Sequence, residues 1–321
     1  LGVVFISGVL FFLLYIFGIR EKLLDAISPS LKNGIAVGIG LFIAFIGFQN
    51  AGLIVSAPGT LVKLNPHFAS PDLAVFFFCL LLTAVLHTRR VRGSILWGIV
   101  GATAFSMILK FVLPPESAMV RDSMLMKDFA IAKGIVCLPP SVAPVFMKMD
   151  VVHALTGAMI PLIIMFLFMD VFDTLGTMIG VAEQAGFVKD NKLTRAGKVM
   201  IADQVGTVAG AMLGTSNTTS YIESCAGVEN GGRTGLTALT TAALFLLALF
   251  FCPVIKMIAS YKVITAPALV IVGAMMVGNV RKVDWSDYSE AIPAFLAIIG
   301  IPLSYSISDG LAIGFISYPV I

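Results

Sequence analysis

The strongest constraint on this sequence is a series of apolar runs that are long enough to cross a lipid bilayer. A transmembrane helix needs about 20 mainly apolar residues, and runs of about that length recur along all 321 residues. Charged residues make up only 12% of the chain, whereas soluble domains carry about 25%. The sequence therefore predicts an all-α polytopic membrane protein.

The apolar runs give a first map of the spans. We expect them at about 3–18, 33–55, 72–88, 94–113, 153–178, 198–213, 236–254, 262–280, 290–304 and 307–321. The stretch 215–232, "TSNTTSYIESCAGVENGG", is too polar and Gly-rich for an ordinary span, so we interpret it as a broken one. Lys and Arg then fall mainly in alternate loops, and the positive-inside rule predicts that "REKLL", "HTRRVRG", "VKDNKLTRAGK" and "RKVDW" are cytoplasmic.

Two further features concern the loops and the chain's beginning. The loop 114–152 has Pro pairs near both ends, and we expect it outside the cytoplasm with a short helix between those pairs. The sequence starts inside an apolar run, which predicts that earlier spans of the natural protein precede Leu1.

Composition argues against several classes of function. The net charge of +3 is too small to indicate a nucleic-acid partner, and the four cysteines show no paired spacing. The three histidines are scattered without metal-ligand neighbours at helical spacing. We therefore expect no metal site, no cofactor and no enzymatic activity, since an intramembrane enzyme needs a nucleophile–base pair or a metal set.

Carboxylates inside predicted spans are the main functional signal. In "FLFMDVFDTLGTMIG", Asp170 and Asp173 lie three residues apart and so share a helix face. A charged side chain at the bilayer centre costs ~2.5–3.5 kcal/mol or more, so such residues are functional by default. For Asp170 we favour a binding site over helix packing, whereas for Asp173 a site and a gate or packing role remain open. Asp203 in "IADQVG" is either a proton-path residue or a packing contact.

The broken span supplies a third carboxylate, Glu223. Non-helical backbone at membrane depth is tolerated only where protein or a water-filled cavity receives it, and discontinuous spans indicate a transporter binding site. Glu223 is expected where the extended piece gives way to a half-helix. Its carboxylate either caps that half-helix or, as we favour, binds a ligand or a proton in a cavity.

Long motifs in this chain resemble one family. The segments "FMDVFDTLGTMIGVAEQAG", "GTSNTTSYIESCAGVENGGRTGLTAL" and "PLSYSISDGLAIGFISY" are similar to the AzgA-like guanine/hypoxanthine permeases, a branch of the nucleobase–cation symporters related to the uracil permease. "GIGLFIAFIGFQNAGLIV" and "TAPALVIVGAMMVG" fit as well. The resemblance covers essentially the whole chain, with its motifs in order.

The resemblance implies a fold of fourteen segments in two inverted seven-segment repeats, with a short strand in one broken segment of each repeat. Residues 1–113 would be the remainder of the first repeat and 153–321 the second, so the first three segments would precede this chain. The spans within 33–113 and 236–304 would form a gate domain. The other spans, including 153–232 and 307–321, would form a core domain. Uracil-permease-like relatives also give an expectation of a homodimer.

The resemblance also implies a site and a mechanism. Its substrate carboxylates fall on Glu223 and on the Asp170–Asp173 pair, with Asp170 placed first. Glu223 would accept N–H bonds from guanine or hypoxanthine, because a carboxylate is an acceptor-only group. Thr219 and Ser220 would donate to the base's carbonyl, and Phe168 or Phe172 would stack on its ring, although simple packing is the favoured interpretation of either ring.

Coupling and cargo remain open within transport. We expect H⁺ as the coupling ion, carried by Asp170 or Asp173 with Asp203 on the path, although Na⁺ remains an alternative. Another nucleobase (uracil, xanthine or adenine) or a small anion is the alternative cargo. An anion would need a basic group near the break, where the sequence offers only Arg233.

Overall fold

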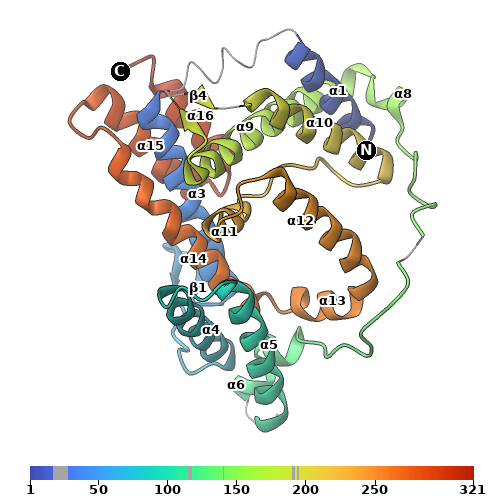
Figure 1. Cartoon of the computed structure of the whole chain (residues 1–321), viewed down its shortest axis with the longest axis vertical. Coiled ribbons are helices and arrows are strands. Elements are labelled where there is room, and N and C mark those ends of the chain that lie inside the picture. The colour runs from blue at the N-terminus through green and yellow to red at the C-terminus, as the bar shows by residue number, and fades with distance from the viewer. Residues whose placement is uncertain (17–27, 115–117, 140, 190–191, 194) are drawn as a thin grey trace. The chain divides into compact units, whose positions relative to one another are not determined.

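The computed structural model describes residues 1–321 except 17–27, 115–117, 140, 190–191 and 194 (Figure 1). The described chain is mainly helical. By length and composition, six of its helical segments can cross a membrane: Pro29–Asn50, Pro71–Thr88, Ser94–Val112, Gly157–Ala185, Gly235–Ser260 and Lys262–Lys282. The prediction of a helical polytopic membrane protein is therefore confirmed in outline.

The chain folds into two compact units. Unit 1 comprises residues 1–42, 140–228 and 276–321, and unit 2 comprises residues 43–139 and 229–275. The helices of unit 1 are α1 (Gly2–Ile16), the first part of α3 (Pro29–Asn50), α8 (Val151–Ala154), α9 (Ile160–Ala185), α10 (Ala196–Leu213), α11 (Ser224–Glu229), α15 (Tyr288–Ser304) and α16 (Ile307–Ser317). Those of unit 2 are the remainder of α3, α4 (Pro71–Thr88), α5 (Ser94–Val112), α6 (Ala118–Arg121), α7 (Met124–Lys127), α12 (Gly235–Ala248), α13 (Cys252–Ser260) and most of α14 (Ala266–Val277).

The described residues also form short elements in both units. They are the 3-10 turns η1 (Gly157–Met159), η2 (Leu249–Phe251), η3 (Lys262–Ile264) and η4 (Gly278–Lys282), and the strands β1 (Ile54–Ala57), β2 (Leu61–Leu64), β3 (Val188–Lys189) and β4 (Lys192–Leu193). The strands pair as two antiparallel hairpins, β1 with β2 and β3 with β4.

Within unit 1, α1 packs beside α9 and α10, while α16 packs against α15 and α9 (Figure 1). Small residues bring these backbones together. A Cβ built on Gly38 of α3 would lie 2.8 Å from the Ala297 carbonyl oxygen of α15. One built on Gly310 of α16 would overlap the backbone nitrogen of Ile301. Such contacts are the usual way for membrane helices to approach closely, and they hold α15 in unit 1.

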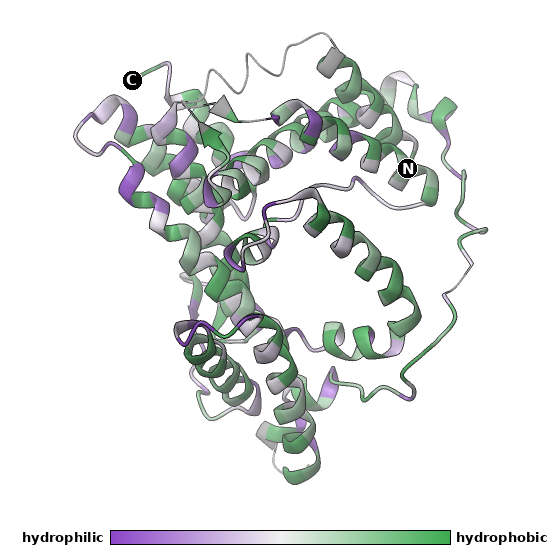
Figure 2. Ribbon diagram, viewed as in Figure 1, coloured by the Kyte–Doolittle hydropathy of each residue, from purple (hydrophilic) through white to green (hydrophobic). Residues whose placement is uncertain are grey.

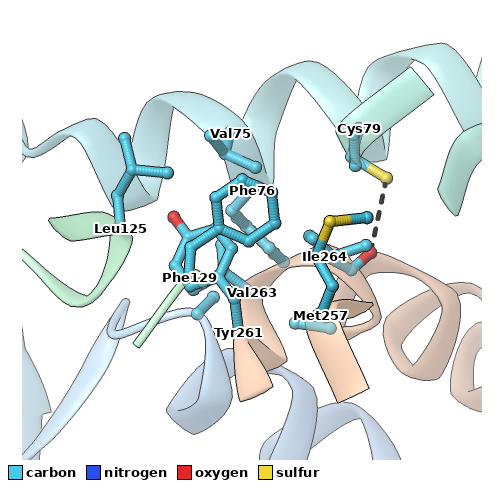
Figure 3. Packing of buried hydrophobic residues seen from close by; sticks show 12 residues of the cluster. Val75, Phe76, Cys79, Leu125, Phe129, Met257, Tyr261, Val263 and Ile264 are labelled. Atoms are coloured by element: carbon cyan, nitrogen blue, oxygen red, sulfur yellow. Dashed lines mark hydrogen bonds between the residues drawn. The ribbon is translucent and has the colours of Figure 1, made fainter. Parts of the chain in front are cut away.

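Unit 2 has its own hydrophobic core (Figure 3). Helix α4 supplies Val75, Phe76 and Cys79, and the Cys79 thiol donates to the Ile264 carbonyl at 3.9 Å. The remaining buried members are Ala51, Ala102, Leu125, Phe129, Met257, Tyr261, Val263, Ile264 and Ala266. By contrast, only 6% of the apolar window in Gly235–Ser260 is buried, and Figure 2 colours most of α12 as hydrophobic.

A buried carboxylate binds part of the loop 114–152 to the helices of unit 2. The Asp72 side chain, 6% exposed, accepts the backbone N–H groups of Met124 and Leu125, both at 2.9 Å. These N–H groups begin α7, whose N-cap Ser123 makes no side-chain capping bond. The Tyr261 hydroxyl donates to the same carboxylate at 2.7 Å. Asp72 therefore joins α4, α7 and the turn before η3.

Tyr261→Phe is expected to lower the free energy of unfolding by ~2 kcal/mol, because a hydrogen bond to a buried charged group is lost. Tyr261 is fully buried, so water cannot replace the missing donor. Thermal unfolding of the purified protein measures the change. Tyr288→Phe, at a side chain 75% exposed, is the control and should leave the unfolding temperature unchanged. An equal effect at both positions would contradict this account of Asp72.

Several boundaries differ from the sequence-based expectations. The span expected at 33–55 ends at Asn50, and residues 54–57 form strand β1, because Gly52 adopts a positive φ of 71° that ends the helix. The expected span 236–254 bends through η2, and α13 restarts with Pro253 in its first turn. The loop 114–152 holds two four-residue helices, α6 and α7, between its Pro pairs.

Two expectations about architecture remain predictions. The inverted repeat and the core and gate domains are not established by the structure, in which α15, expected in the gate, packs on α16 within unit 1. The broken span is non-helical from 215 to 223, as expected, but within the described residues it pairs with no strand. A strand needs a hydrogen-bonded neighbour, so the short strand also remains a prediction.

Candidate functional site

The two aspartates of the opening motif lie on α9, where they face different neighbours. Asp170 is buried, with 1% of its surface exposed, and Asp173 is half-buried. The Ser308 hydroxyl of α16 donates to Asp173 Oδ1 at 2.7 Å. Asp170 instead receives donors from α10 and from the broken segment. The two aspartates predicted to share a helix face therefore have different roles: Asp173 makes a packing contact with α16, and Asp170 belongs to a polar cluster.

Helix α10 supplies a second buried carboxylate beside Asp170. Asp203 is 8% exposed, and its Oδ2 accepts the Thr174 hydroxyl of α9 at 2.7 Å. Gln204 is 1% exposed and its Nε2 lies 3.2 Å from Asp203 Oδ2 and 3.2 Å from Asp170 Oδ2. A single amide group therefore bridges the two carboxylates.

The broken segment begins where α10 ends. Gly214 has a φ of 91°, a left-handed conformation that glycine adopts without strain, and the chain stays non-helical until α11 starts at Ser224. On α10, Gly206 and Gly210 leave room for this segment: a Cβ on Gly206 would lie 2.9 Å from Thr218 Oγ1, and one on Gly210 would lie 2.9 Å from Thr215 Cγ2. Small residues on one helix face thus let irregular backbone lie against it.

Hydrogen bonds attach the broken segment to both carboxylates. Asn217 Nδ2 donates to Asp170 Oδ1 at 3.1 Å. The Ser220 backbone N–H and hydroxyl both donate to Asp203 Oδ1, at 3.0 and 3.3 Å. The Thr207 hydroxyl of α10 donates to the Thr218 carbonyl at 2.8 Å. The backbone polar groups that a broken span would leave unsatisfied are thereby partly received by α10, as membrane burial requires.

We call Asp170, Asp203, Gln204, Asn217 and Ser220 the polar junction. All donors to its carboxylates are neutral, and within the described part of the chain no Lys or Arg forms an ion pair with either aspartate. The Gln204 Oε1 atom is buried and finds no hydrogen-bond partner among those residues. The polar junction is therefore an acceptor-rich site with one unsatisfied carbonyl, suited to a ligand or ion that supplies N–H groups or protons.

The other residues expected in the site lie outside this junction. Glu223 sits immediately before α11, as expected, but its side chain is exposed and no described hydrogen bond links it to Asp170 or Asp203. Phe168 and Phe172 stack on each other with ring centroids 6.2 Å apart, and Phe168 is 56% exposed. Thr219 is closer to the expectation, since its hydroxyl lies 3.4 Å from that of Thr174.

Sequence reasoning missed Gln204, Asn217 and Thr207. The signal for α10 was present, because Asp203 and Thr207 are four residues apart and therefore share a helix face inside an apolar span. For Gln204 and Asn217 no comparable spacing exists, since their role depends on how the broken segment folds back onto α10.

Comparison with known proteins gives consistent matches over the chain. Residues 1–313 match a protein family described as a permease family. The chain is 47% identical over all of its length to the Methanocaldococcus jannaschii protein MJ0326, named only as a permease, and covers 69% of it. It is 42% identical to the Bacillus subtilis guanine/hypoxanthine permease PbuG, over 99% of this chain and 68% of PbuG. It is 36% identical to the Escherichia coli adenine permease AdeQ, over 99% of this chain and 67% of AdeQ.

Proposed function

Since this protein belongs to the permease family that its residues 1–313 match, we propose that it imports guanine and hypoxanthine across the cytoplasmic membrane in symport with protons. It is a multi-pass membrane permease and not an enzyme. The preference for guanine and hypoxanthine rests on its relatives PbuG and PbuO, which are named as permeases for these two bases.

The observation that carries the proposal is the attachment of the non-helical segment 215–223 to Asp170 and Asp203. Guanine and hypoxanthine are neutral, flat and rich in N–H donors along one edge, and carboxylates are acceptor-only groups. Charge-assisted hydrogen bonds of this kind are roughly twice as strong as neutral ones. A purine beside the polar junction would meet Asp170, the Gln204 carbonyl and the hydroxyls of Thr219 and Ser220. Phe168 or Phe172 would stack on its ring.

The paired carboxylates also support proton coupling. The Oδ2 atoms of Asp170 and Asp203 each lie 3.2 Å from the same Gln204 nitrogen, so they are no farther apart than twice that distance. Two negative charges at that separation or closer repel by at least about 2.5 kcal/mol at an effective dielectric constant of ~20. A proton bound by Asp170 or Asp203 removes that repulsion. We assign the proton to this pair because one proton relieves the repulsion between its two charges. Asp173, whose Oδ1 accepts the Ser308 hydroxyl, is the alternative carrier.

Glu223 is proposed as the carboxylate that holds the base from the α11 side of the break. Glu223→Gln is expected to reduce hypoxanthine uptake at least about tenfold, because one acceptor oxygen is replaced by a donor that faces the purine N–H groups. Initial-rate uptake at equal surface expression measures the effect, with Glu229→Gln at the end of the same short helix as the control. Unchanged uptake in the Glu223 variant would remove this residue from the site.

Transport of another base is the main alternative, and a specific observation favours adenine. AdeQ and AdeP, both named as adenine permeases, are each 36% identical to this chain. Xanthine, uracil and a small anion remain further alternatives. The domain proposals follow the family as well: two inverted repeats, a core that holds substrate, a gate beside it, and a homodimer in the membrane.

The experiment that ranks these cargoes is competition for uptake. Cells that lack their own purine permeases would express the full-length protein and take up labelled hypoxanthine. Unlabelled guanine, adenine, xanthine and uracil would serve as competitors, with and without a protonophore. We expect saturable uptake that guanine blocks and the protonophore abolishes. Strong block by adenine alone would show that adenine is the cargo. Uptake that depends on a Na⁺ gradient rather than on the proton gradient would identify Na⁺ as the coupling ion.

A further inference from the structure

A turn with three arginines joins two span-length helices of unit 2. Helix α4 ends at Thr88 and α5 begins at Ser94, and the connection carries Arg89, Arg90 and Arg92. All three side chains are exposed, and within the described residues no carboxylate lies within 4 Å of them. Three unpaired cations are thus concentrated in one short turn that links the ends of two membrane-spanning helices.

The backbone of this turn is tightly fixed. The N–H of Arg90 bonds to the His87 carbonyl at 2.9 Å and that of Val91 to the Leu86 carbonyl at 2.9 Å, which is the double bond pattern of a Schellman helix end. Gly93 has a φ of 70°, and its N–H donates to the Asn230 side chain at 3.2 Å. The arginines are therefore presented on a rigid turn rather than on a flexible loop.

Arg90 occupies the position that glycine usually takes in such a helix end. Its φ is +57°, in the left-handed region that costs free energy for every residue with a Cβ. A cation near a helix C-terminus is favourable by itself, and Arg89 already provides one at the C-cap. The presence of Arg rather than Gly at position 90 is therefore unexplained by the helix end, and such strain commonly marks a functional position.

The flanks of the same two helices are suited to lipid. Exposed apolar side chains continue away from the turn on both: Leu81 and Val85 on α4, and Leu96 and Val100 on α5. Trp97, one turn into α5, is 57% exposed. Trp is enriched where the hydrocarbon meets the headgroups, and at that level Trp97 would put the adjacent arginines beside the lipid phosphates.

We propose that the turn 89–93 binds the phosphate group of an anionic phospholipid at the cytoplasmic surface. Arginine matches phosphate because its planar guanidinium donates two parallel N–H bonds, and clusters of basic residues at the cytoplasmic end of spans bind anionic headgroups. Lipid is the favoured source of the phosphate because apolar flanks and Trp97 would lie along the acyl chains of the same molecule.

Thermal unfolding of the purified full-length protein tests this proposal. The protein would be held in detergent micelles under three conditions. The micelles would carry added phosphatidylcholine alone, phosphatidylcholine with phosphatidylglycerol, or phosphatidylcholine with inorganic phosphate in the buffer. We expect phosphatidylglycerol to raise the unfolding temperature by about 5 °C, as for a ligand at about one hundred times its Kd. Arg90→Gly should remove at least about half of that gain, while raising the unfolding temperature without anionic lipid because glycine accepts the positive φ.

The opposite signs of these two effects separate lipid binding from a structural role of Arg90. Arg281→Gln, beside a different span in another basic stretch, is the matched control and should keep the full phosphatidylglycerol effect. The proposal would be overturned by no phosphatidylglycerol effect in the wild type, or by an equal loss in the Arg281 variant, which would indicate general surface charge. An equal gain with inorganic phosphate would show that the ligand is a free anion instead.

Discussion

Replacing Asp203 by asparagine is expected to reduce purine uptake at least about tenfold while leaving the helices of unit 1 folded. Asp203 Oδ1 accepts two hydrogen bonds from Ser220, and Oδ2 accepts those of Thr174 and Gln204. Asparagine has only one acceptor oxygen, so its amide group must face either the Ser220 donors or the Thr174 and Gln204 donors. Each lost bond to a charged group is worth about 1.5–3 kcal/mol, and about 1.4 kcal/mol is a factor of ten in an equilibrium constant.

The effect is expected on transport because two of these four bonds, those from Ser220, hold the broken segment in place. Helix α1 packs against both α9 and α10, and we expect these contacts to remain in the variant. Initial-rate uptake at matched surface expression measures the loss. Asp309→Asn is the control, since that aspartate is exposed on α16 of the same unit. Equal uptake by the Asp203 variant and the wild type would show that the polar junction plays no part in transport.

Gly310→Ala is expected to destabilise the protein by about 3 kcal/mol, which is at the upper end of ordinary overpacking. The new Cβ would overlap the backbone nitrogen of Ile301, so no change of rotamer can relieve the contact and α16 must move away from α15. The gain that alanine normally gives over glycine inside a helix, up to about 1 kcal/mol, does not offset this. The unfolding temperature should fall by several degrees.

The same substitution at an open site is the control for Gly310. Nothing lies within 4 Å of a Cβ built on Gly278, which belongs to unit 1 as well. Gly278→Ala should therefore leave the unfolding temperature unchanged. If Gly310→Ala unfolded at the wild-type temperature too, the close approach of α15 and α16 described above would be wrong.

Much of this architecture is predictable from the sequence because apolar run length reports spans directly. The break after α10 was also predictable, since Gly214 and the polar run that follows it exclude a regular lipid-exposed helix. The hairpin of β1 and β2 was not, because its residues continue an apolar run and only the positive φ of Gly52 ends the helix. Local sequence carries no direct record of that conformation.

The candidate site also contains residues whose role was predictable from the sequence and residues whose role was not. The burial of Asp170 followed from the cost of a carboxylate in hydrocarbon, and Asp203 was recognised as a candidate on the same argument. The bridge through Gln204 depends on the approach of two helices, and the support from Asn217 and Ser220 depends on the path of an irregular segment. Neither the Gln204 bridge nor the support from Asn217 and Ser220 produces a regular spacing of residues in the sequence. The exposure of Glu223 likewise depends on where α11 lies and not on its neighbours in sequence.

Equilibrium binding of labelled hypoxanthine to the purified full-length protein tests the central claim most directly, with the wild type compared with the Asp203→Asn and Asp309→Asn variants. The account predicts saturable binding to the wild type that excess guanine displaces. It also predicts binding at least about tenfold weaker in the Asp203 variant and unchanged binding in the Asp309 variant, measured at a temperature at which all three proteins are folded. Absence of binding by a stably folded wild type, or equal affinity in all three proteins, would contradict a purine site at the polar junction.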